Sequence, residues 1–338
     1  MNLSRRSIFG LFVFLFTCLF LALVFCLDCF FPIKNIVKNE IVVLPVNTSA
    51  FTLVKQFKQR HWVHSGLAVN AYLRLSGLDS HLYAGRYWLK PGMSVRDLLL
   101  NMSQSRGMVT YQFQIIPGAT FFDILRRVKQ SPDLNNNLKG LSAKDIRKLL
   151  RISYSSVEGL LAPNTYQYVY GNDASLIMNV SYKKMQVNLK RVWDKRAKYL
   201  PYKNSYQLLI AASLIEAEAK LDRERPLVSS VLVNRLRINM PLQFDSTVLY
   251  GLHQHLGGRL TRQDLVRLTP FNTYKVTGLP PTPIDNPGLA SLRAAAHPAK
   301  TDYLYFVVDP WSKLGAHVFS RTLAGHEKAV KNYVSSLS

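Results

Sequence analysis

One helical segment carries the residues best suited to acid–base chemistry. Residues 211–220 read AASLIEAEAK, with strong helix formers and neither Gly nor Pro. On a helix, Ala211, Leu214 and Ile215 lie on the same face as Glu218, because they precede it by seven, four and three residues. A carboxylate among apolar side chains is costly when charged, so we expect burial to raise the pKa of Glu218. Such a carboxyl group is suited to general acid catalysis near neutral pH.

A second glutamate on the same segment is predicted to do something different. Glu216 lies about 200° around the helix from Glu218, and its i+4 neighbour is Lys220. We therefore predict that Glu216 is a solvated ion-pair residue and that Glu218 faces the core. The chain has only six Glu, and three of them fall between residues 216 and 224. Many helical Glu are plain surface charges, and helix spacing alone leaves that interpretation of Glu218 open.

Composition limits the classes of partner. The chain has 338 residues, enough for two domains and an appended segment, and a net charge of +23. Such a charge favours polyanionic partners such as nucleic acid, anionic lipid or an acidic polymer. The Lys and Arg residues are scattered singly or in short groups, without zinc-finger spacing or an RNP-like aromatic run. We interpret them as a solvated basic surface and predict no nucleic-acid partner.

Cysteine and histidine spacing gives no metal site. All three cysteines, Cys18, Cys26 and Cys29, lie in or beside the first apolar segment. The rest of the sequence therefore lacks the residues for a disulfide framework or a Cys-based zinc site. His253 and His255 form an H-x-H pair without an apparent third ligand. We predict neither a bound metal nor a cofactor.

The first segment predicts a membrane anchor. Residues 8–27 form an uncharged apolar run long enough to span a bilayer, and Arg5 and Arg6 precede it. The positive-inside rule places the N-terminus in the cytoplasm and the rest of the chain outside it. A cleaved signal peptide is the alternative. The length of the run and the absence of a small-x-small site in residues 28–32 favour an uncleaved anchor.

The remaining pattern mixes short strands with helices, which indicates an α+β fold. Near the N-terminus we expect a strand at 41–45, helical structure over 50–75 with a break near 65–66, a strand at 83–89 and a helix at 95–103. Further along we expect a strand at 111–116, helices at 121–129, 143–151, 174–199, 204–220 and 225–238, mostly loops over 240–287, a helix at 289–296, paired strands at 303–308 and 317–320, and a final helix at 325–337.

The motifs around Glu218 resemble a known family. From about residue 205 to 337 the sequence resembles the catalytic domain of the endolytic murein transglycosylases, the MltG/YceG family. The matching segments are 212–218, 224–225, 233–236, 242–251, 272–274, 277–281, 286–288 and 294–299, together with the strands 303–307 and 317–319. Residues 158–166, EGLLAPNTY, resemble the motif that precedes the catalytic helix in that family. The resemblance extends over nearly the whole chain.

The resemblance implies a domain organisation. Residues 1–30 would form a cytoplasmic tail and transmembrane anchor, and residues 31–108 a LysM-like α+β module. Residues 109–203 would form a linking α+β subdomain, and residues 204–338 a mixed α/β catalytic domain of the YceG-like type. The implied location is the bacterial inner membrane, with a single pass and the catalytic region in the periplasm.

The resemblance also implies an activity. The family cleaves the MurNAc–GlcNAc β-1,4 bond of peptidoglycan without water and leaves a 1,6-anhydroMurNAc end. Its acid/base glutamate falls on Glu218, which would serve as general acid and then as base. The implied role is to terminate the elongation of nascent glycan strands. Partners would be peptidoglycan glycan strands and the membrane, with membrane-bound peptidoglycan synthases as further candidates.

Several polar residues are candidates for contacting the substrate: Gln243, Asp245, Asn272, Thr273, Tyr274 and Glu158. Each has an alternative interpretation. Gln243 fits a loop cap, Asp245 fits a helix N-cap before Ser246, and residues 272–274 fit ordinary loop chemistry. Glu158 is equally suited to a role in a turn or at a helix start.

Some positions depart from the family pattern. Phe271 stands where Tyr is common, Ala219 where Thr often follows the catalytic Glu, and Asn164 in place of Asp. These departures place secondary substrate contacts in doubt and leave Glu218 intact. Two other functions stay open. One is a hydrolytic muramidase, and the other is a cell-wall-binding scaffold with vestigial catalysis.

Overall fold

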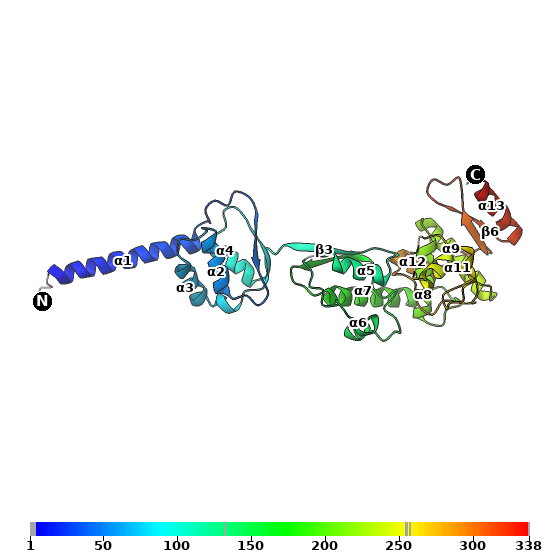
Figure 1. The fold of residues 1–338 in the computed structure, drawn as a ribbon, viewed down its shortest axis with the longest axis horizontal. Coiled ribbons are helices and arrows are strands. Elements are labelled where there is room, and N and C mark those ends of the chain that lie inside the picture. Colours follow the sequence, from blue (N-terminus) through cyan, green and yellow to red (C-terminus); the bar gives the residue numbers. More distant parts are fainter. Residues whose placement is uncertain (1–4, 132, 254–255, 257, 337–338) are drawn as a thin grey trace. The chain divides into compact units, whose positions relative to one another are not determined.

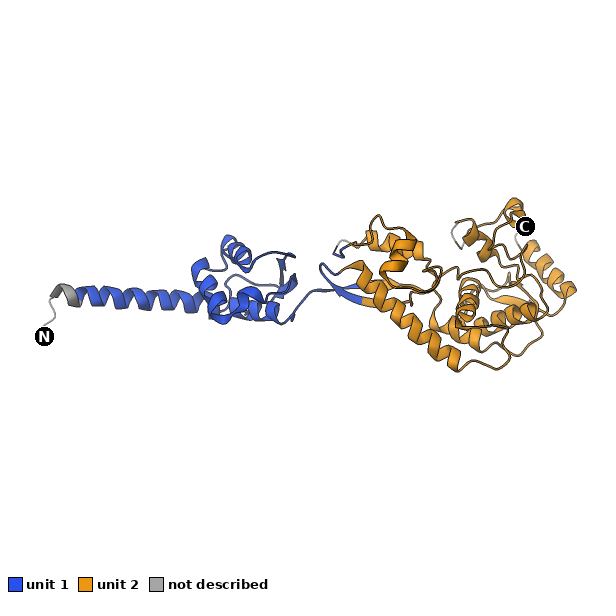
Figure 2. Cartoon of the chain, turned by 90° about the horizontal axis from the view of Figure 1, so that it is seen from below, with its two compact units in different colours: residues 1–112, 133–135, 167–172 blue, residues 113–132, 136–166, 173–338 orange. Residues whose placement is uncertain are grey.

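The computed structural model describes residues 5–131, 133–253, 256 and 258–336. Its elements are drawn in chain order in Figure 1. The chain divides into two compact units (Figure 2). Unit 1 comprises residues 1–112, 133–135 and 167–172, and unit 2 comprises residues 113–132, 136–166 and 173–338. The described part mixes helices with short strands, consistent with the α+β prediction, whereas the division into four parts stays a prediction.

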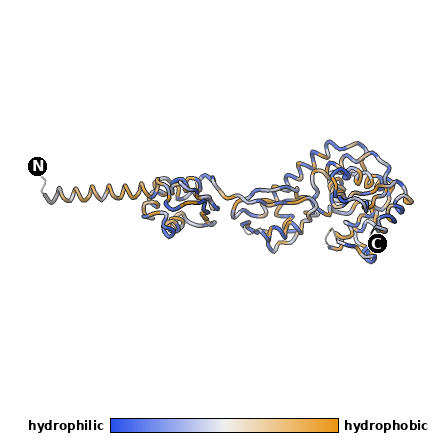
Figure 3. The backbone as a smooth tube through the Cα atoms, turned by 90° about the horizontal axis from the view of Figure 1, so that it is seen from above, coloured by the Kyte–Doolittle hydropathy of each residue, from blue (hydrophilic) through white to orange (hydrophobic). Residues whose placement is uncertain are grey.

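Unit 1 begins with the helix α1 (Arg5–Phe30). Its segment Phe9–Phe30 has a mean hydropathy of 2.8 and is long and apolar enough to cross a membrane, as its colouring in Figure 3 shows. The last turn of α1 behaves differently. Asp28 and Cys29 are buried, and the Asp28 carboxylate accepts hydrogen bonds from the backbone N–H groups of His64 (2.8 Å) and Ser65 (2.6 Å). The end of α1 is therefore part of the core of unit 1.

The rest of unit 1 follows a strand–helix–helix–strand order. Its elements are β1 (Glu40–Leu44), α2 (Ala50–Gln59), α3 (Gly66–Ser76), a short 3₁₀ turn η1 (Leu78–Ser80), β2 (Gly85–Leu89) and α4 (Val95–Ser103). The strands β1 and β2 pair antiparallel, with Val42 opposite Tyr87. The Ser94 hydroxyl and the Asp97 carboxylate form a capping box at the start of α4, as the Ser at this position predicts. The expected break in the helical stretch lies between α2 and α3.

The chain passes between the two units through two strands, β3 (Thr110–Ile115) and β4 (Asn164–Val169), which form a two-stranded sheet. Two helices, α5 (Phe121–Lys129) and α6 (Ala143–Leu149), lie between these strands in the sequence, and a third, α7 (Ala174–Asp194), follows β4. The prediction for α7 ran to residue 199, which is too long. The helix ends at Asp194 because the chain turns toward α12, where Ala197 N–H donates to the Ala296 carbonyl (2.9 Å).

The core of unit 2 surrounds the helix α8 (Ser205–Glu218). Residues 208–215 of α8 are all buried, and the helix packs against α7, α9 (Arg225–Arg237), α10 (Asp245–Gly251) and α12 (Leu289–Ala296). A helix that is apolar on every side has no solvent face, which matters for the glutamates near its end. A further short turn, η2 (Asp222–Glu224), precedes α9. Residues 240–287, expected to be mostly loops, also hold α10 and α11 (Arg262–Val266).

The C-terminal part of unit 2 is a hairpin and a helix. The strands β5 (Tyr305–Val308) and β6 (His317–Ser320) pair antiparallel, with Phe306 opposite Phe319, which confirms the predicted strand pair. The helix α13 (Leu323–Ser335) follows. It begins two residues earlier than predicted because Thr322 caps it, accepting a hydrogen bond from Gly325 N–H (3.2 Å).

Candidate active site

The helix α8 presents a carboxyl group at its last residue. Glu218 ends the helix, and Ala219 leaves it in an extended conformation. The Glu218 side chain is mostly buried, and its Oε1 atom accepts a hydrogen bond from the Ser246 hydroxyl at 2.7 Å. Burial and the negative charge of Asp245 together raise the pKa of Glu218 to about 7, against the lowering effect of the hydrogen bonds from Ser246. The helix spacing predicted that burial would raise the pKa of Glu218, and the structure agrees with that direction.

Glu216 corrects a sequence prediction. It is not a solvated partner of Lys220, because its side chain is 6% exposed and pairs with the Arg225 guanidinium at 3.1 Å. Its second oxygen accepts a hydrogen bond from Gly288 N–H at 2.8 Å, at the N-cap of α12. Two facts account for the error: α8 is buried on all sides, and it ends before Lys220, so no i+4 partner exists. Glu216 therefore ties α8 to α9 and α12.

The segment before α10 lies beside Glu218. The helix begins at Asp245 after Phe244, which is its N-cap, so the N-cap interpretation of Asp245 is wrong. Asp245 instead accepts a hydrogen bond from the Tyr274 hydroxyl at 2.6 Å. Burial and the neighbouring carboxylates of Asp245 and Glu218 raise the pKa of Tyr274, so this phenol stays a neutral donor. Gln243 lies two residues before Asp245. It has a φ of 52°, and its side chain is exposed.

Asn272 and Thr273 are buried and point into the protein. The Asn272 side-chain amide donates to the carbonyls of Leu265 (3.0 Å) and Arg267 (2.7 Å). The Thr273 hydroxyl accepts from Phe244 N–H at 3.0 Å. All of these contacts are within the protein, and none points to a substrate. Direct contact of Asn272 or Thr273 with a substrate therefore stays a prediction. Their observed effect is to fix the loop that carries Tyr274.

Arg235 is a residue that the sequence did not single out. Its side chain is buried, and its guanidinium donates to the carbonyls of Leu304 (2.6 Å) and Leu242 (2.6 Å). It also donates to the Gln243 side chain at 3.4 Å. Among the described residues, no carboxylate lies within ion-pair distance of Arg235. In the sequence, the one indication that Arg235 matters was its place in the matched segment 233–236. Residue spacing cannot reveal its contact with Leu304, which is 69 residues further along the chain.

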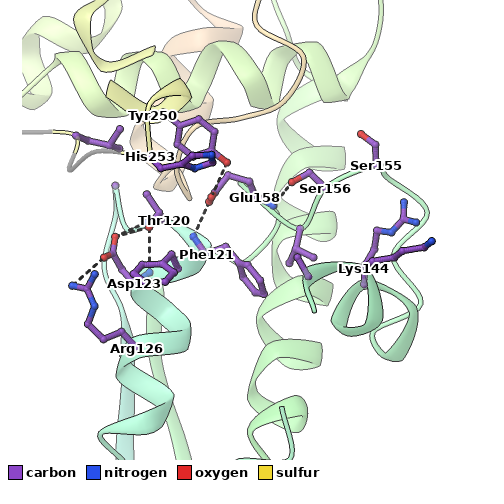
Figure 4. Close-up of a pocket in the computed structure, with 16 residues that line it drawn as sticks. Thr120, Phe121, Asp123, Arg126, Lys144, Ser155, Ser156, Glu158, Tyr250 and His253 are labelled. Atoms are coloured by element: carbon purple, nitrogen blue, oxygen red, sulfur yellow. Dashed lines mark hydrogen bonds and ion pairs between the residues drawn. The ribbon is translucent and has the colours of Figure 1, made fainter. Parts of the chain in front are cut away.

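Glu158 lies at a separate position. It is 5% exposed, and it accepts hydrogen bonds from Phe121 N–H (2.9 Å), the Tyr250 hydroxyl (3.2 Å) and the Asn286 amide (3.4 Å). Burial raises its pKa to about 7, against the lowering effect of the hydrogen bonds from Phe121 N–H and the Tyr250 hydroxyl. Figure 4 shows Glu158 between Tyr250 and Phe121. Glu158 and Glu218 therefore lie at different places on α10: Glu218 contacts Ser246, and Glu158 contacts Tyr250.

A cavity of about 900 Å³ opens beside Glu158. Its lining comes from α5, α6, the loop 155–158 and α10, and Glu218 is not among the lining residues. No group of His, Cys, Asp and Glu that could hold a metal occurs in the described part of the chain. The H-x-H pair is only half described, since residue 255 lies outside the described residues.

The fold and the site together define a mixed helix–strand protein built around a buried helix that ends in a carboxyl group suited to proton transfer. A model of the YceG-like family matches residues 42–332. The chain belongs to this family, as the resemblance of its motifs predicted.

Named relatives agree with this family. The chain is 42% identical over 183 residues to an endolytic murein transglycosylase of Bacillus subtilis (strain 168), covering 53% of this chain and 49% of that protein. It is 30% identical over 205 residues to a protein of the same name from Streptococcus pneumoniae (serotype 2, strain D39), covering 59% of this chain and 35% of that protein. The chain thus spans about half the length or less of these relatives.

A solved structure is also similar. The crystal structure of a putative YceG-like protein from Listeria monocytogenes superposes with a TM-score of 0.54 and 28% sequence identity. The match covers 86% of this chain and 98% of that chain. The similarity therefore includes most of both molecules.

Proposed function

We propose that the protein is an endolytic lytic transglycosylase that cleaves the MurNAc–GlcNAc β-1,4 bond of peptidoglycan and leaves a 1,6-anhydroMurNAc end. The observation that carries the proposal is the Glu218 carboxyl group, partly buried at the end of α8 with a pKa of about 7. Its two protonation states have similar free energies near neutral pH, as a group that first donates and then accepts a proton requires. The names of the relatives supply the substrate class.

The reaction needs one catalytic carboxyl group. Protonated Glu218 donates its proton to the glycosidic oxygen as the bond from C1 of MurNAc to that oxygen breaks. The C6 hydroxyl of the same MurNAc attacks C1, and the Glu218 carboxylate accepts the hydroxyl proton. No water is consumed, and Glu218 returns to its protonated form. Ordinary glycosidases use two carboxyl groups, whereas here the intramolecular hydroxyl replaces the second, because its attack needs only a held geometry.

Residues around Glu218 assist this step. The Ser246 hydroxyl holds Oε1 and fixes the orientation of the carboxyl group. Asp245 lies close enough to raise the pKa of Glu218, so its charge also favours the positive charge that develops on the sugar. We assign substrate contact to Asp245, Tyr274 and Gln243. Asn272 and Thr273 act as positioning residues for the loop.

We propose that α1 anchors the protein in the cytoplasmic membrane of a bacterium, with the catalytic region on the periplasmic side. Arg5 and Arg6 at the start of α1 favour this orientation. Support for an uncleaved helix comes from the burial of Asp28 and Cys29 in the core of unit 1, because removal of α1 would take core residues with it. The strand–helix–helix–strand order of residues 40–89 supports a LysM-like, glycan-binding module. An anchored enzyme of this kind would terminate nascent strands close to membrane-bound synthases.

Product analysis tests the proposal. The detergent-purified protein is incubated with isolated sacculi, and the products are identified by mass spectrometry. We expect anhydro-ended fragments from the wild type and none from Glu218→Gln, which keeps the shape but cannot donate the proton. Glu327→Gln on the exposed face of α13 is the matched control and should stay active.

Three results would contradict the proposal. Reducing ends would indicate hydrolysis by water, and equal digestion by Glu218→Gln would remove the carboxyl group from the chemistry. Full complementation of a deletion strain by Glu218→Gln would favour a binding scaffold instead of an enzyme.

A further inference from the structure

The cavity beside Glu158 has the size of a ligand site. Its volume of about 900 Å³ is at the upper end of the range for small-molecule pockets, about 300–1,000 Å³. One wall is the start of α5, with Phe121 and Phe122, and another is α6, with Lys144 and Arg147. Tyr250 of α10 closes one end (Figure 4). The cavity therefore accommodates a peptide or a sugar unit with its substituents.

The helix α10 connects this cavity to the candidate catalytic group. Ser246 and Tyr250 are four residues apart on α10 and share a face of the helix. Ser246 holds Glu218, and Tyr250 donates to Glu158 at the cavity. Side chains with this spacing have Cβ atoms about 5–6 Å apart. The cavity therefore begins about one helical turn along α10 from Ser246, the residue that holds Glu218.

The charges of the cavity favour an anionic ligand. Arg126 pairs with Asp123 at 3.6 Å. Lys144 and Arg147 have no carboxylate within ion-pair distance among the described residues, and Arg147 donates to the carbonyl of Tyr154 at 3.0 Å. The remaining lining carboxyl group, Glu158, is buried, and its oxygens accept hydrogen bonds from Phe121 N–H and the Tyr250 hydroxyl; burial raises its pKa to about 7. The lining thus presents two uncompensated cations.

The apolar part of the lining fits a peptide better than a bare sugar. Phe122 is 67% exposed at the start of α5, and the Arg126 guanidinium lies 5.1 Å from its ring centroid. The lining therefore provides an aromatic surface for methyl groups at Phe122 and cations for carboxylates at Lys144 and Arg147. When stem peptides are attached, the lactyl carboxyl group of each MurNAc is held in an amide bond, so the carboxylates available to Lys144 and Arg147 are those of the peptide.

We propose that this cavity binds the acidic stem peptide attached to the MurNAc whose C1 is attacked. Lys144 and Arg147 bind the peptide carboxylates, and Phe122 packs against its apolar groups. Glu158 is a positioning residue that fixes Phe121 and Tyr250 at the end of the cavity. This assignment rests on the proposed function and extends it, because it makes the peptide a determinant of which strands are cleaved.

The test compares two substrates and one matched pair of variants. Uncross-linked glycan strands with intact stem peptides are compared with the same strands after an amidase has removed the peptides. The amidase leaves one lactyl carboxylate on each MurNAc, so the two substrates differ in the peptide and its carboxylates. Lys144→Glu reverses an exposed charge in the cavity, and Lys148→Glu reverses an exposed charge on the same helix outside it. We expect Lys144→Glu to lower kcat/KM on peptide-bearing strands about tenfold more than on peptide-free strands, through KM. Lys148→Glu should leave both values unchanged.

A binding measurement separates this inference from the proposed activity. The stem peptide released by the amidase is titrated into the wild type, Lys144→Glu and Lys148→Glu in calorimetry. We expect binding to the wild type and Lys148→Glu that weakens about tenfold in Lys144→Glu and declines with added salt. Binding without cleavage of any strand would refute the lytic activity and leave the peptide site standing. Cleavage with equal effects of Lys144→Glu on both substrates, and no peptide binding, would overturn the site.

Discussion

Replacement of Ser246 by Ala tests how the environment sets the pKa of Glu218. The Ser246 hydroxyl donates to Glu218 Oε1 at 2.7 Å, and this hydrogen bond lowers the Glu218 pKa against the raising effect of burial, which leaves it at about 7. A hydrogen bond to a charged group contributes about 1.5–3 kcal/mol, and one pKa unit corresponds to about 1.4 kcal/mol. The backbone N–H of residue 246, which also favours the carboxylate, survives in Ala. We therefore expect the pKa of Glu218 to rise by about one unit.

The pH–rate profile measures this shift. Glu218 must be protonated to begin the reaction, so kcat/KM of the wild type should fall as pH rises through about 7. In Ser246→Ala this decline should move upward by about one unit, toward pH 8. The maximal rate should drop about tenfold, since the carboxyl group loses its fixed orientation. Release of anhydro-ended products is followed from about pH 5 to about pH 9.

A matched serine provides the control. Ser181 is also fully buried and donates to a backbone carbonyl, that of Met178 at 2.9 Å, away from Glu218. Ser181→Ala should reproduce the loss of stability that comes from removing a buried serine hydroxyl. It should leave the pH–rate profile unchanged. An unmoved profile in Ser246→Ala, or an equal shift in Ser181→Ala, would refute the reasoning that the hydroxyl tunes Glu218.

Two further predictions concern the framework of the site, both measured by chemical denaturation. Gly159 has a φ of 77°, and a Cβ there would collide with Pro283, so Gly159→Ala should destabilise unit 2 by about 3 kcal/mol. Gly140→Ala, with a φ of 81° and open space around it, should cost only about 1 kcal/mol, and equal losses would contradict the collision. Arg225→Met leaves the buried Glu216 carboxylate unpaired and should cost about 3–5 kcal/mol. A loss as small as that in exposed Arg223→Met would show that Glu216 is not held by this pair.

Sequence patterns predicted the features that depend on neighbouring residues. The uncharged run in α1 predicted a helix able to cross a membrane, and the structure has it over Phe9–Phe30. The position of Glu218 relative to Leu214 and Ile215 predicted a carboxyl group with a raised pKa. Capping residues such as Ser94 located helix starts, because a cap acts within three residues of itself.

The same local reasoning failed where burial comes from distant elements. Glu216 was predicted to be solvated because it faces away from Glu218, yet α8 is enclosed on every side and Glu216 meets Arg225 and Gly288. The apolar residues around the whole circumference of α8 were the available signal, since such a helix has no solvent face. Asp245 was weighed as a helix N-cap, and the actual start of α10 gave that role to Phe244.

The sequence by itself predicted an apolar helix long enough to cross a membrane, the mixed helix–strand class and the acidic residue that we propose for proton transfer. Each of these follows from residues within one or two helical turns of one another. Only the tertiary structure decided that Ser246 holds Glu218 and that a cavity lined by Lys144 and Arg147 opens one turn further along α10. Those partners lie tens of residues apart in the chain, and packing around α8, which no local spacing encodes, brings them together.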